Sequence, residues 1–247
     1  MLYDVGIRVE KTIAVGKYVV FDVVLDNGKK AIARIPQSCI KLINEEKCRR
    51  DSRDLELELE NILRIKSDKI VKHIKLINMS EYNISIREYI EKTLRDLINN
   101  KELTFTRIIE ISRDVALALN DIHTAGFVFA DLKPENVGIN IDGKAILLDL
   151  DSLTKPYTKP RFITYSYAPP EYLRDGIVVY ESDVYQLALL IHEMIHGELL
   201  NPVLHQGFSH IENDELSDLL KRMLNPIPFL RPELLDIVNE LESILKN

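Results

Sequence analysis

The sequence predicts an α+β fold in which a strand-rich first third is joined to a mostly helical remainder. Residues 3–35 run in β-branched and aromatic side chains, and an Asp-Asn-Gly turn signal at 26–28 separates two of these runs. Beyond Thr93 the apolar residues follow helical spacing. No repeat, low-complexity tract or linker interrupts the 247 residues, so we expect one domain over 1–247.

The composition is that of an ordinary soluble globular protein, with 46% apolar and 29% charged residues. A net charge of −7 argues against a nucleic-acid partner, because such affinity comes largely from Lys and Arg on phosphates. No apolar run approaches the ~18 residues that suggest a membrane span, and the first residues lack the apolar core of a secretory signal. We therefore expect a cytoplasmic protein without a membrane span.

The cysteines Cys39 and Cys48 are the only two in the sequence. With no second cysteine pair and no histidines at metal-ligand spacing from these cysteines, the sequence supports neither a disulfide framework nor a cysteine-based zinc site. A reducing cytosol fits this cysteine usage best.

After the first strands, the chain is expected to form a helix and a pair of strands. Residues 53–65 have helical spacing, with apolar side chains on one face and charges on the other. The charged run 44–53 is interpreted as a solvated loop or helix end. Short strands are predicted at 70–77 and 83–90.

The remainder is expected to be mainly helical. Helices are predicted at 94–100, at 105–123 and over much of 181–245, and the amphipathic stretch 105–123 is interpreted as core packing. The apolar runs 137–141 and 145–150 flank an Asp-Gly pair and predict a hairpin.

The segment 123–141, HTAGFVFADLKPENVGINI, combines an Asp, a Lys and an Asn at short spacing. It resembles the catalytic loop of Ser/Thr protein kinases from the Asp onward. The chemistry explains the spacing, since Asp131 would orient a substrate hydroxyl and accept its proton, while Asn136, five residues on, would hold a metal ion. By resemblance, Lys133 steadies the transferred γ-phosphate.

The same resemblance implies a magnesium ligand and a two-lobed fold. Asp149 ends an apolar run where the family has the metal-binding Asp of its D-F-G motif, and a carboxylate suits a hard cation. The implied cofactors are ATP and Mg²⁺ or Mn²⁺. We expect a small β-rich N-lobe over 1–90 and a larger helical C-lobe over 91–247.

Further segments resemble the family in the family's own order. The segment TYSYAPPE at 164–171 is similar to the end of the activation segment. In the segment ESDVY, the resemblance makes Asp183 the residue that braces the catalytic loop through backbone N–H groups. It also makes Arg231 the ion-pair partner of Glu171.

The predicted N-lobe matches the family more weakly. Glu58 lies on a predicted helix where the family has a Glu that pairs with a strand lysine, but Arg34 stands in place of that lysine. The backbone at Glu88 and Ile90 is expected to bind adenine. Of the glycines expected in the phosphate-binding loop, only Gly16 is present.

Two more departures bear on the site and its regulation. Arg87 stands at the residue that usually gates the rear of the adenine pocket, where it would pair with Glu58 or Asp149. Ala130 replaces an Arg that, in the family, commonly binds a phosphorylated residue of the activation segment. We therefore expect no requirement for phosphorylation of that segment.

The leading hypothesis is an ATP-dependent transferase that phosphorylates Ser or Thr hydroxyls of protein substrates, this chain itself being one candidate. The runner-up is a pseudokinase, an interaction module with weak or no nucleotide binding, which Arg34 and the eroded glycine loop favour. A kinase for small-molecule alcohols is a third reading. The string His192-Glu193-Met194-Ile195-His196 also matches the H-E-x-x-H motif of zinc proteases, although no third ligand is evident.

Overall fold

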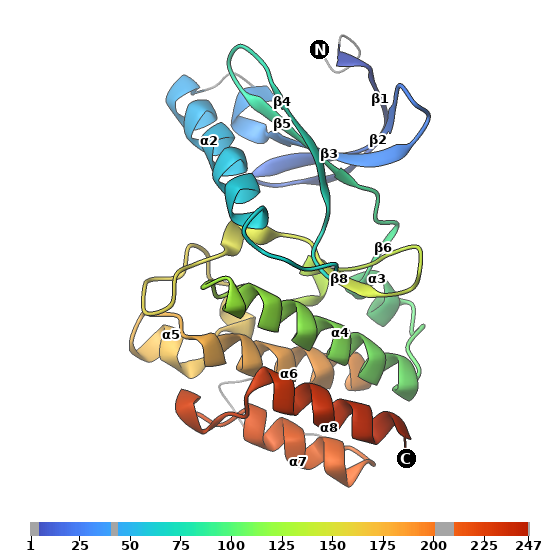
Figure 1. The fold of residues 1–247 in the computed structure, drawn as a ribbon, viewed down its shortest axis with the longest axis vertical. Coiled ribbons are helices and arrows are strands. Elements are labelled where there is room, and N and C mark those ends of the chain that lie inside the picture. Colours follow the sequence, from blue (N-terminus) through green and yellow to red (C-terminus); the bar gives the residue numbers. More distant parts are fainter. Residues whose placement is uncertain (1–4, 41–43, 201–209, 247) are drawn as a thin grey trace. The chain divides into compact units, whose positions relative to one another are not determined.

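The computed structural model describes residues 5–40, 44–200 and 210–246 (Figure 1). The chain divides into two compact units. The N-terminal unit comprises Met1–Arg64 and Val71–Glu91, and the C-terminal unit comprises Ile65–Ile70 and Lys92–Asn247. Sheet structure dominates the first unit and helices dominate the second, as the α+β prediction requires.

The N-terminal unit is built on a five-stranded antiparallel sheet with the order β1-β2-β3-β5-β4. The first three strands form the predicted meander, and Gly28 takes a φ of 77° in the turn between β2 and β3. Alternate residues such as Ala31 and Ala33 point into the buried face. The strands are β1 Ile7–Val15, β2 Tyr18–Leu25, β3 Lys30–Pro36, β4 His73–Asn78 and β5 Asn83–Glu88.

A long helix, α2, runs from Glu45 to Ile62 and follows the short helix α1, Gln37–Ile40. The predicted helix began at residue 53, eight residues after the observed start, whereas the alternative that the charged run 44–53 is a helix end is confirmed. Asn44 caps the helix by accepting a hydrogen bond from the Lys47 N–H at 2.9 Å, and two glutamates occupy the first turn, where the helix dipole favours negative charge. The charged run is thus the exposed beginning of the helix.

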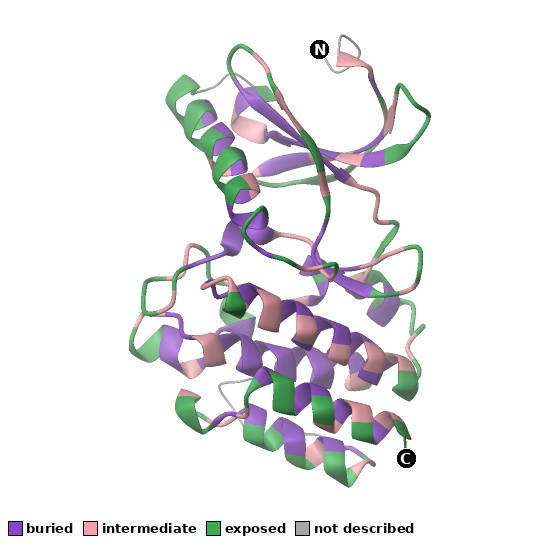
Figure 2. Ribbon diagram, viewed as in Figure 1, coloured by how far each residue is buried: buried purple, intermediate pink, exposed green. Residues whose placement is uncertain are grey.

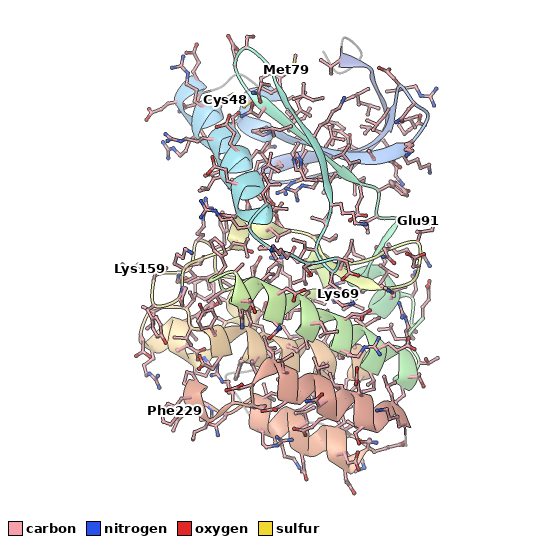
Figure 3. The ribbon with its side chains drawn as sticks, in the orientation of Figure 1. Cys48, Lys69, Met79, Glu91, Lys159 and Phe229 are labelled. Carbon is pink, nitrogen blue, oxygen red and sulfur yellow. A yellow bond between two sulfur atoms is a disulfide. The ribbon has the colours of Figure 1, made fainter. Side chains whose placement is uncertain are left out.

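A disulfide joins Cys39 on α1 to Cys48 on α2, which is labelled in Figure 3. The expectation that the sequence supports no disulfide is therefore wrong for this pair. The packing of α1 against α2 brings the two Cα atoms to 4.8 Å, within the range that a disulfide spans. Spacing along the sequence could not reveal that approach, because it depends on how the two helices pack.

The C-terminal unit consists mainly of helices, with a small three-stranded sheet of order β6-β7-β8. The predicted hairpin forms as β7 and β8, in which Gly138 pairs with Ile146. Its helices are α3 Leu94–Asn99, α4 Phe105–Thr124, α5 Pro170–Arg174, α6 Tyr180–His196, α7 Asp214–Met223 and α8 Leu234–Lys246, and its strands are β6 Lys92–Thr93, β7 Val137–Ile139 and β8 Ala145–Leu147.

Helix α6 is the core of the C-terminal unit. Figure 2 shows it buried along most of its length, and α4 packs against both α6 and α8. Helix α6 ends at Gly197, whose φ of 76° is the left-handed conformation typical of a helix C-terminus. A buried helix gives polar side chains on it a rigid, poorly solvated platform. Among the described residues, no helix is both long and apolar enough to cross a membrane.

Candidate active site

The segment that precedes Asp131 is held by the carboxylate of Asp183, near the beginning of α6. The backbone N–H groups of Phe129 and Ala130 each donate to this carboxylate at 2.8 Å. Nε2 of His123 lies 2.8 Å from the same group. Asp183 is fully buried, so these contacts supply the charge-assisted hydrogen bonds that a buried carboxylate needs. The predicted bracing role of Asp183 is confirmed.

The backbone at Ala130 is held in an unusual conformation. Its φ of 69° is costly for a residue with a Cβ, so surrounding contacts must maintain it. Its carbonyl accepts hydrogen bonds from the Tyr172 hydroxyl and from Nε2 of Gln186, each at 3.3 Å. Gln186 also accepts from the Leu132 N–H at 3.1 Å. Helix α6 thereby fixes the backbone on both sides of Asp131.

The carboxylate of Asp131 is surrounded by hydrogen-bond donors. Nζ of Lys133 lies 2.6 Å from Oδ2, and Nδ2 of Asn136 lies 3.1 Å from the same oxygen. The hydroxyl of Thr164 donates to Oδ1 at 2.6 Å and accepts from Nζ of Lys133 at 3.0 Å. The structure therefore brings together the two residues predicted to be catalytic, and adds a threonine hydroxyl to them.

Asn136 and Asp149, the two predicted metal ligands, flank the β7–β8 hairpin. The Leu148 N–H donates to the Asn136 carbonyl at 2.9 Å, which places Asp149 one residue beyond a direct link to Asn136. Nδ2 of Asn136 is directed to Asp131, so its side-chain oxygen is the atom suited to a cation. One carboxylate and one amide oxygen fit Mg²⁺, which keeps phosphate oxygens and waters as its other ligands.

A buried ion pair joins Glu171, on α5, to Arg231, which lies just before α8. Glu171 receives both terminal nitrogens of Arg231 at 2.8 Å and the Ser182 hydroxyl at 2.7 Å. Arg231 also donates to the carbonyls of Asn225 and Glu181, so its planar fork is engaged on several sides. The predicted partnership of Glu171 and Arg231 is confirmed.

In the N-terminal unit, Arg34 and Arg87 contact the same carboxylate. Nη1 of Arg34 lies 3.2 Å and 3.3 Å from the two oxygens of Glu58, and Nη2 of Arg87 donates to Oε2 of Glu58. All three side chains are buried. Arg34 therefore keeps the ion pair expected of the strand lysine, and the prediction that Arg87 would pair with Glu58 is also confirmed.

His73 extends this cluster on β4. Its Nε2 lies 3.1 Å from the hydroxyl of Ser85, which also accepts from Nε of Arg87 at 3.2 Å. Burial and the positive charge of Arg87 lower the pKa of His73 to about 4. The imidazole is consequently neutral at physiological pH, and the cluster gains no third cation.

Three further residues predicted to contact nucleotide, Gly16, Glu88 and Ile90, lie in the N-terminal unit, and their surroundings give no evidence for or against that role. Gly16 lies between β1 and β2, and a Cβ added there would meet nothing within 4 Å, so local packing alone does not require glycine. The Glu88 N–H donates to the Lys72 carbonyl at 3.0 Å at the end of β5. Ile90 follows in the connection to β6. The adenine-binding role of Glu88 and Ile90 stays a prediction.

A model of the protein kinase domain matches residues 19–243, which is most of the chain. The chain belongs to the protein kinase domain family. This kinase domain is 26% identical over 230 residues to a probable serine/threonine-protein kinase of Clostridium perfringens, a match covering 83% of this chain and 33% of that protein.

Two mycobacterial relatives match shorter stretches of this kinase domain. The serine/threonine-protein kinase PknB of Mycobacterium leprae is 28% identical over 143 residues, covering 53% of this chain and 23% of that protein. The serine/threonine-protein kinase PknL of Mycobacterium tuberculosis is 34% identical over 112 residues, covering 42% and 28%. The chain therefore spans about a third or less of the length of these relatives.

The zinc-protease reading of the kinase domain's H-E-x-x-H string finds no support. Both carboxylate oxygens of Glu193 are engaged, one by Arg95 and the other by the hydroxyl of Tyr167. Within the described residues, no group of three or more His, Cys, Asp or Glu side chains is arranged to hold a metal ion. The string is part of the buried helix α6, as the kinase resemblance implies.

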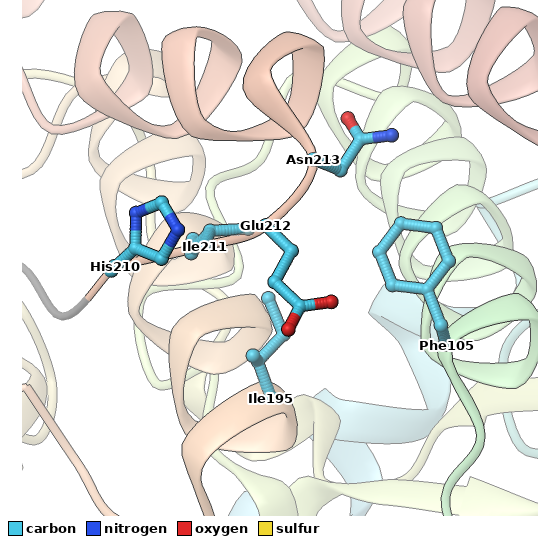
Figure 4. Close-up of a pocket in the computed structure, with 6 residues that line it drawn as sticks. All are labelled: Phe105, Ile195, His210, Ile211, Glu212 and Asn213. Carbon is cyan, nitrogen blue, oxygen red and sulfur yellow. The ribbon is translucent and has the colours of Figure 1, made fainter.

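A pocket of about 470 Å³ opens elsewhere in the C-terminal unit (Figure 4). Its lining includes none of the predicted catalytic and metal-binding residues, so it is separate from the predicted site. Its lining residues are Phe105, Ile195, His210, Ile211, Glu212 and Asn213.

Sequence reasoning missed the role of Thr164 in this kinase domain. The residue was noted only as the beginning of the activation-segment match, and it lies 33 residues beyond Asp131. Helical or strand periodicity gives no signal for a contact between two irregular segments. Only the fold shows that the Thr164 hydroxyl reaches the carboxylate of Asp131.

Proposed function

We propose that this chain catalyses ATP-dependent phosphoryl transfer to Ser or Thr hydroxyls of protein substrates. The observation that supports this most directly is the environment of Asp131. Its Oδ1 accepts a hydrogen bond from an aliphatic hydroxyl, that of Thr164, at 2.6 Å. A substrate Ser or Thr presents the same kind of donor, so the carboxylate is suited to orient such a group.

In the proposed reaction, the substrate oxygen forms a bond to the γ-phosphorus of ATP. The bond between that phosphorus and the β–γ bridging oxygen breaks, and ADP leaves. Asp131 accepts the proton from the substrate hydroxyl. The ammonium group of Lys133, 2.6 Å from Asp131, lies where it can offset the negative charge of the transferred group.

Asn136 and Asp149 would hold Mg²⁺ or Mn²⁺, which neutralises phosphate charge when bound. Asn136 is pre-oriented for this role, because its amide nitrogen donates to the Asp131 carbonyl at 2.8 Å as well as to the carboxylate. Pre-organised oxygen ligands avoid the cost of ordering flexible side chains during binding.

A pseudokinase that acts as an interaction module is the second candidate. The observation that favours it is the buried contact of Arg34 with Glu58, which Arg87 shares. A planar guanidinium aims its donors differently from the lysine that usually contacts the phosphates. If Arg34 cannot take over that contact, the chain would bind ATP weakly while its C-terminal unit stays intact.

Phosphoryl transfer from radiolabelled ATP with Mg²⁺ or Mn²⁺ tests the proposal on generic protein substrates and on the chain itself. We expect transfer by the wild type and a loss of roughly 10²-fold to 10⁴-fold in Asp131→Asn, because the proton acceptor is removed. Asp149→Asn should also lose transfer. Asp218→Asn, an exposed carboxylate on α7, is the matched control and should leave the rate unchanged.

Wild-type transfer no greater than that of Asp131→Asn would refute the proposed activity. A rise in melting temperature on adding Mg²⁺-ATP reports nucleotide binding independently of catalysis. Nucleotide binding without transfer, or neither, would favour the pseudokinase.

A further inference from the structure

A cluster of charged and phenolic groups lies outside the catalytic residues of the C-terminal unit and centres on Arg95 of α3. Nε of Arg95 lies 2.7 Å from Oε1 of Glu135, and Nη1 lies 2.6 Å from Oε1 of Glu193. Nη2 donates to the hydroxyl of Tyr167 at 3.1 Å, and that hydroxyl donates to Oε2 of Glu193. All three nitrogens of one guanidinium are therefore used.

These groups differ in their exposure. The side chain of Glu193 is only 3% exposed, whereas those of Arg95 and Glu135 are 27% and 47% exposed. Burial tends to lower the pKa of Arg95, but the hydrogen bonds to Glu135 and Glu193 outweigh it and raise the pKa. Burial, together with Glu193, raises the pKa of Tyr167 well above its usual value. The cluster thus joins a fixed cation and a neutral phenol to one buried carboxylate, that of Glu193, and one exposed carboxylate, that of Glu135.

The cluster lies close to Asp131 along two segments of the chain. Glu135 follows Asp131 by four residues, and Tyr167 follows Thr164, which hydrogen-bonds Asp131, by three. Four residues of extended chain span at most about 14 Å. The cluster is therefore within reach of a side chain a few residues from an acceptor hydroxyl placed at Asp131, and the peptides of the test below cover both chain directions.

Without Arg95, the carboxylates of Glu135 and Glu193 would lose the guanidinium that they share, and Glu193 is almost fully buried. A buried carboxylate without a cation is costly, so such a site would bind a positively charged side chain from a substrate. In this chain the cation comes from α3 instead. The two glutamates already have their guanidinium before any substrate arrives.

We propose that Arg95 is a specificity-determining residue that occupies, from within the chain, an acidic subsite beside the catalytic loop. The consequence is that substrates need no arginine near the acceptor hydroxyl, because the subsite that would select it is filled. This inference rests on the proposed kinase function, but peptide binding tests it without catalysis. A purely structural Arg95, which only anchors α3, would affect stability and leave peptide preference unchanged.

The test measures binding of fluorescein-labelled peptides by anisotropy at constant ionic strength. The peptides have a neutral background, an Ala at the acceptor position to prevent turnover, and a single Arg placed at each position from four before to four after the acceptor. The proteins compared are wild type, Arg95→Ala, Arg95→Met and Arg95→Lys. Arg222→Ala is the matched control, since Arg222 also donates to one glutamate, Glu240, at a surface elsewhere in the unit.

We expect the wild type, Arg95→Lys and Arg222→Ala to bind peptides with and without Arg within about twofold of one another. Arg95→Ala and Arg95→Met should bind the Arg peptide at least about tenfold more tightly at one or two positions, the scale of a hydrogen bond to a charged group. Adding Glu135→Gln to Arg95→Ala should reduce that gain.

The proposal is overturned if the folded Arg95→Ala and Arg95→Met proteins show no gain for Arg peptides, or if the wild type already prefers them tenfold. Thermal unfolding identifies which variants are folded, and Arg95→Met keeps the packing of the aliphatic stem if Arg95→Ala is unstable. Absence of phosphoryl transfer in the wild type would contradict the proposed function and leave the binding result intact.

Discussion

Two buried glutamates, one in each unit, are neutralised in different ways. Among the described residues, Glu171 in the C-terminal unit pairs with one cation, Arg231, which binds it through two hydrogen bonds of 2.8 Å. Glu58 in the N-terminal unit is shared by two cations, Arg34 and Arg87. Both glutamates are 1% exposed. The contrast is therefore one of pairing and not of burial.

The difference teaches which of the two ion pairs tolerates the loss of a partner. A one-to-one pair leaves an uncompensated buried charge when either member is lost, so its residues are restricted. A shared carboxylate keeps one partner when the other is removed. In the N-terminal unit, Glu58 pairs with Arg34, which replaces the expected lysine, and also with Arg87. The C-terminal pair of Glu171 and Arg231 consists of the two residues that the family resemblance predicts.

The largest expected effect comes from breaking the one-to-one pair. Arg231→Met should lower the free energy of unfolding by about 3–5 kcal/mol, because Glu171 is left buried without its cation. Equilibrium urea unfolding measures this. Arg222→Met, which removes an exposed partner of Glu240, should cost less than about 1 kcal/mol. Equal losses in the two variants would contradict the role assigned to burial.

A smaller effect is expected at the shared carboxylate. Arg87→Met should destabilise the protein less than Arg231→Met, since Glu58 keeps Arg34. The same change should raise the pKa of His73 above its value of about 4, because the positive charge of Arg87 is, after burial, the next largest cause of the depression. An NMR titration of the His73 ring, assigned with His73→Gln, measures this shift.

The direction of the associated pH dependence follows from proton linkage. The unfolded chain binds a proton at His73 near pH 6.5, while the folded chain does so only near pH 4. The stability that neutral His73 contributes above pH 6.5 is therefore lost as the pH falls towards 4. In Arg87→Met this loss should be smaller. Lys75→Met, on the same strand, is the control and should leave the pKa of His73 unchanged.

The sequence predicted the parts of this molecule whose residues lie within short segments. Asp131, Lys133 and Asn136 share one loop, and its resemblance to the family's catalytic loop predicted that the three side chains act together; hydrogen bonds now join them. Asp183 and Arg231 were assigned by resemblance, because their roles depend on contacts between distant segments. Without that resemblance, no periodic pattern in the sequence would have connected them to the site.

The features that the sequence did not predict are contacts between segments that no pattern links. The disulfide of Cys39 and Cys48 depends on how α1 packs against α2. The Arg95 cluster unites residues from α3, the catalytic loop, the activation segment and α6. The start of α2 was misplaced for a local reason, because its first turns are charged and exposed and so lack the apolar spacing that marked the rest.

The smallest effect on the rate of phosphoryl transfer is expected from the hydroxyl residues between 154 and 158, which belong to the predicted activation segment and to neither of the two buried ion pairs. Ala130 offers only a methyl group where an arginine would bind a phosphate. Thr154 is buried with its hydroxyl donating to the Ser152 carbonyl at 2.8 Å, and the Thr158 hydroxyl donates to the Lys155 carbonyl at 2.7 Å. These hydroxyls already have intramolecular partners.

A triple variant tests these hydroxyls by combining Thr154→Val, Tyr157→Phe and Thr158→Val. Its rate of phosphoryl transfer should stay within about twofold of wild type. Thr164→Val is the contrasting variant in the same segment, since it removes the hydroxyl that bridges Asp131 and Lys133. A hydrogen bond between a hydroxyl and a charged group is worth enough for a loss of about tenfold or more. A large drop in the triple variant, with its fold intact, would contradict the expectation that phosphorylation of this segment is not required.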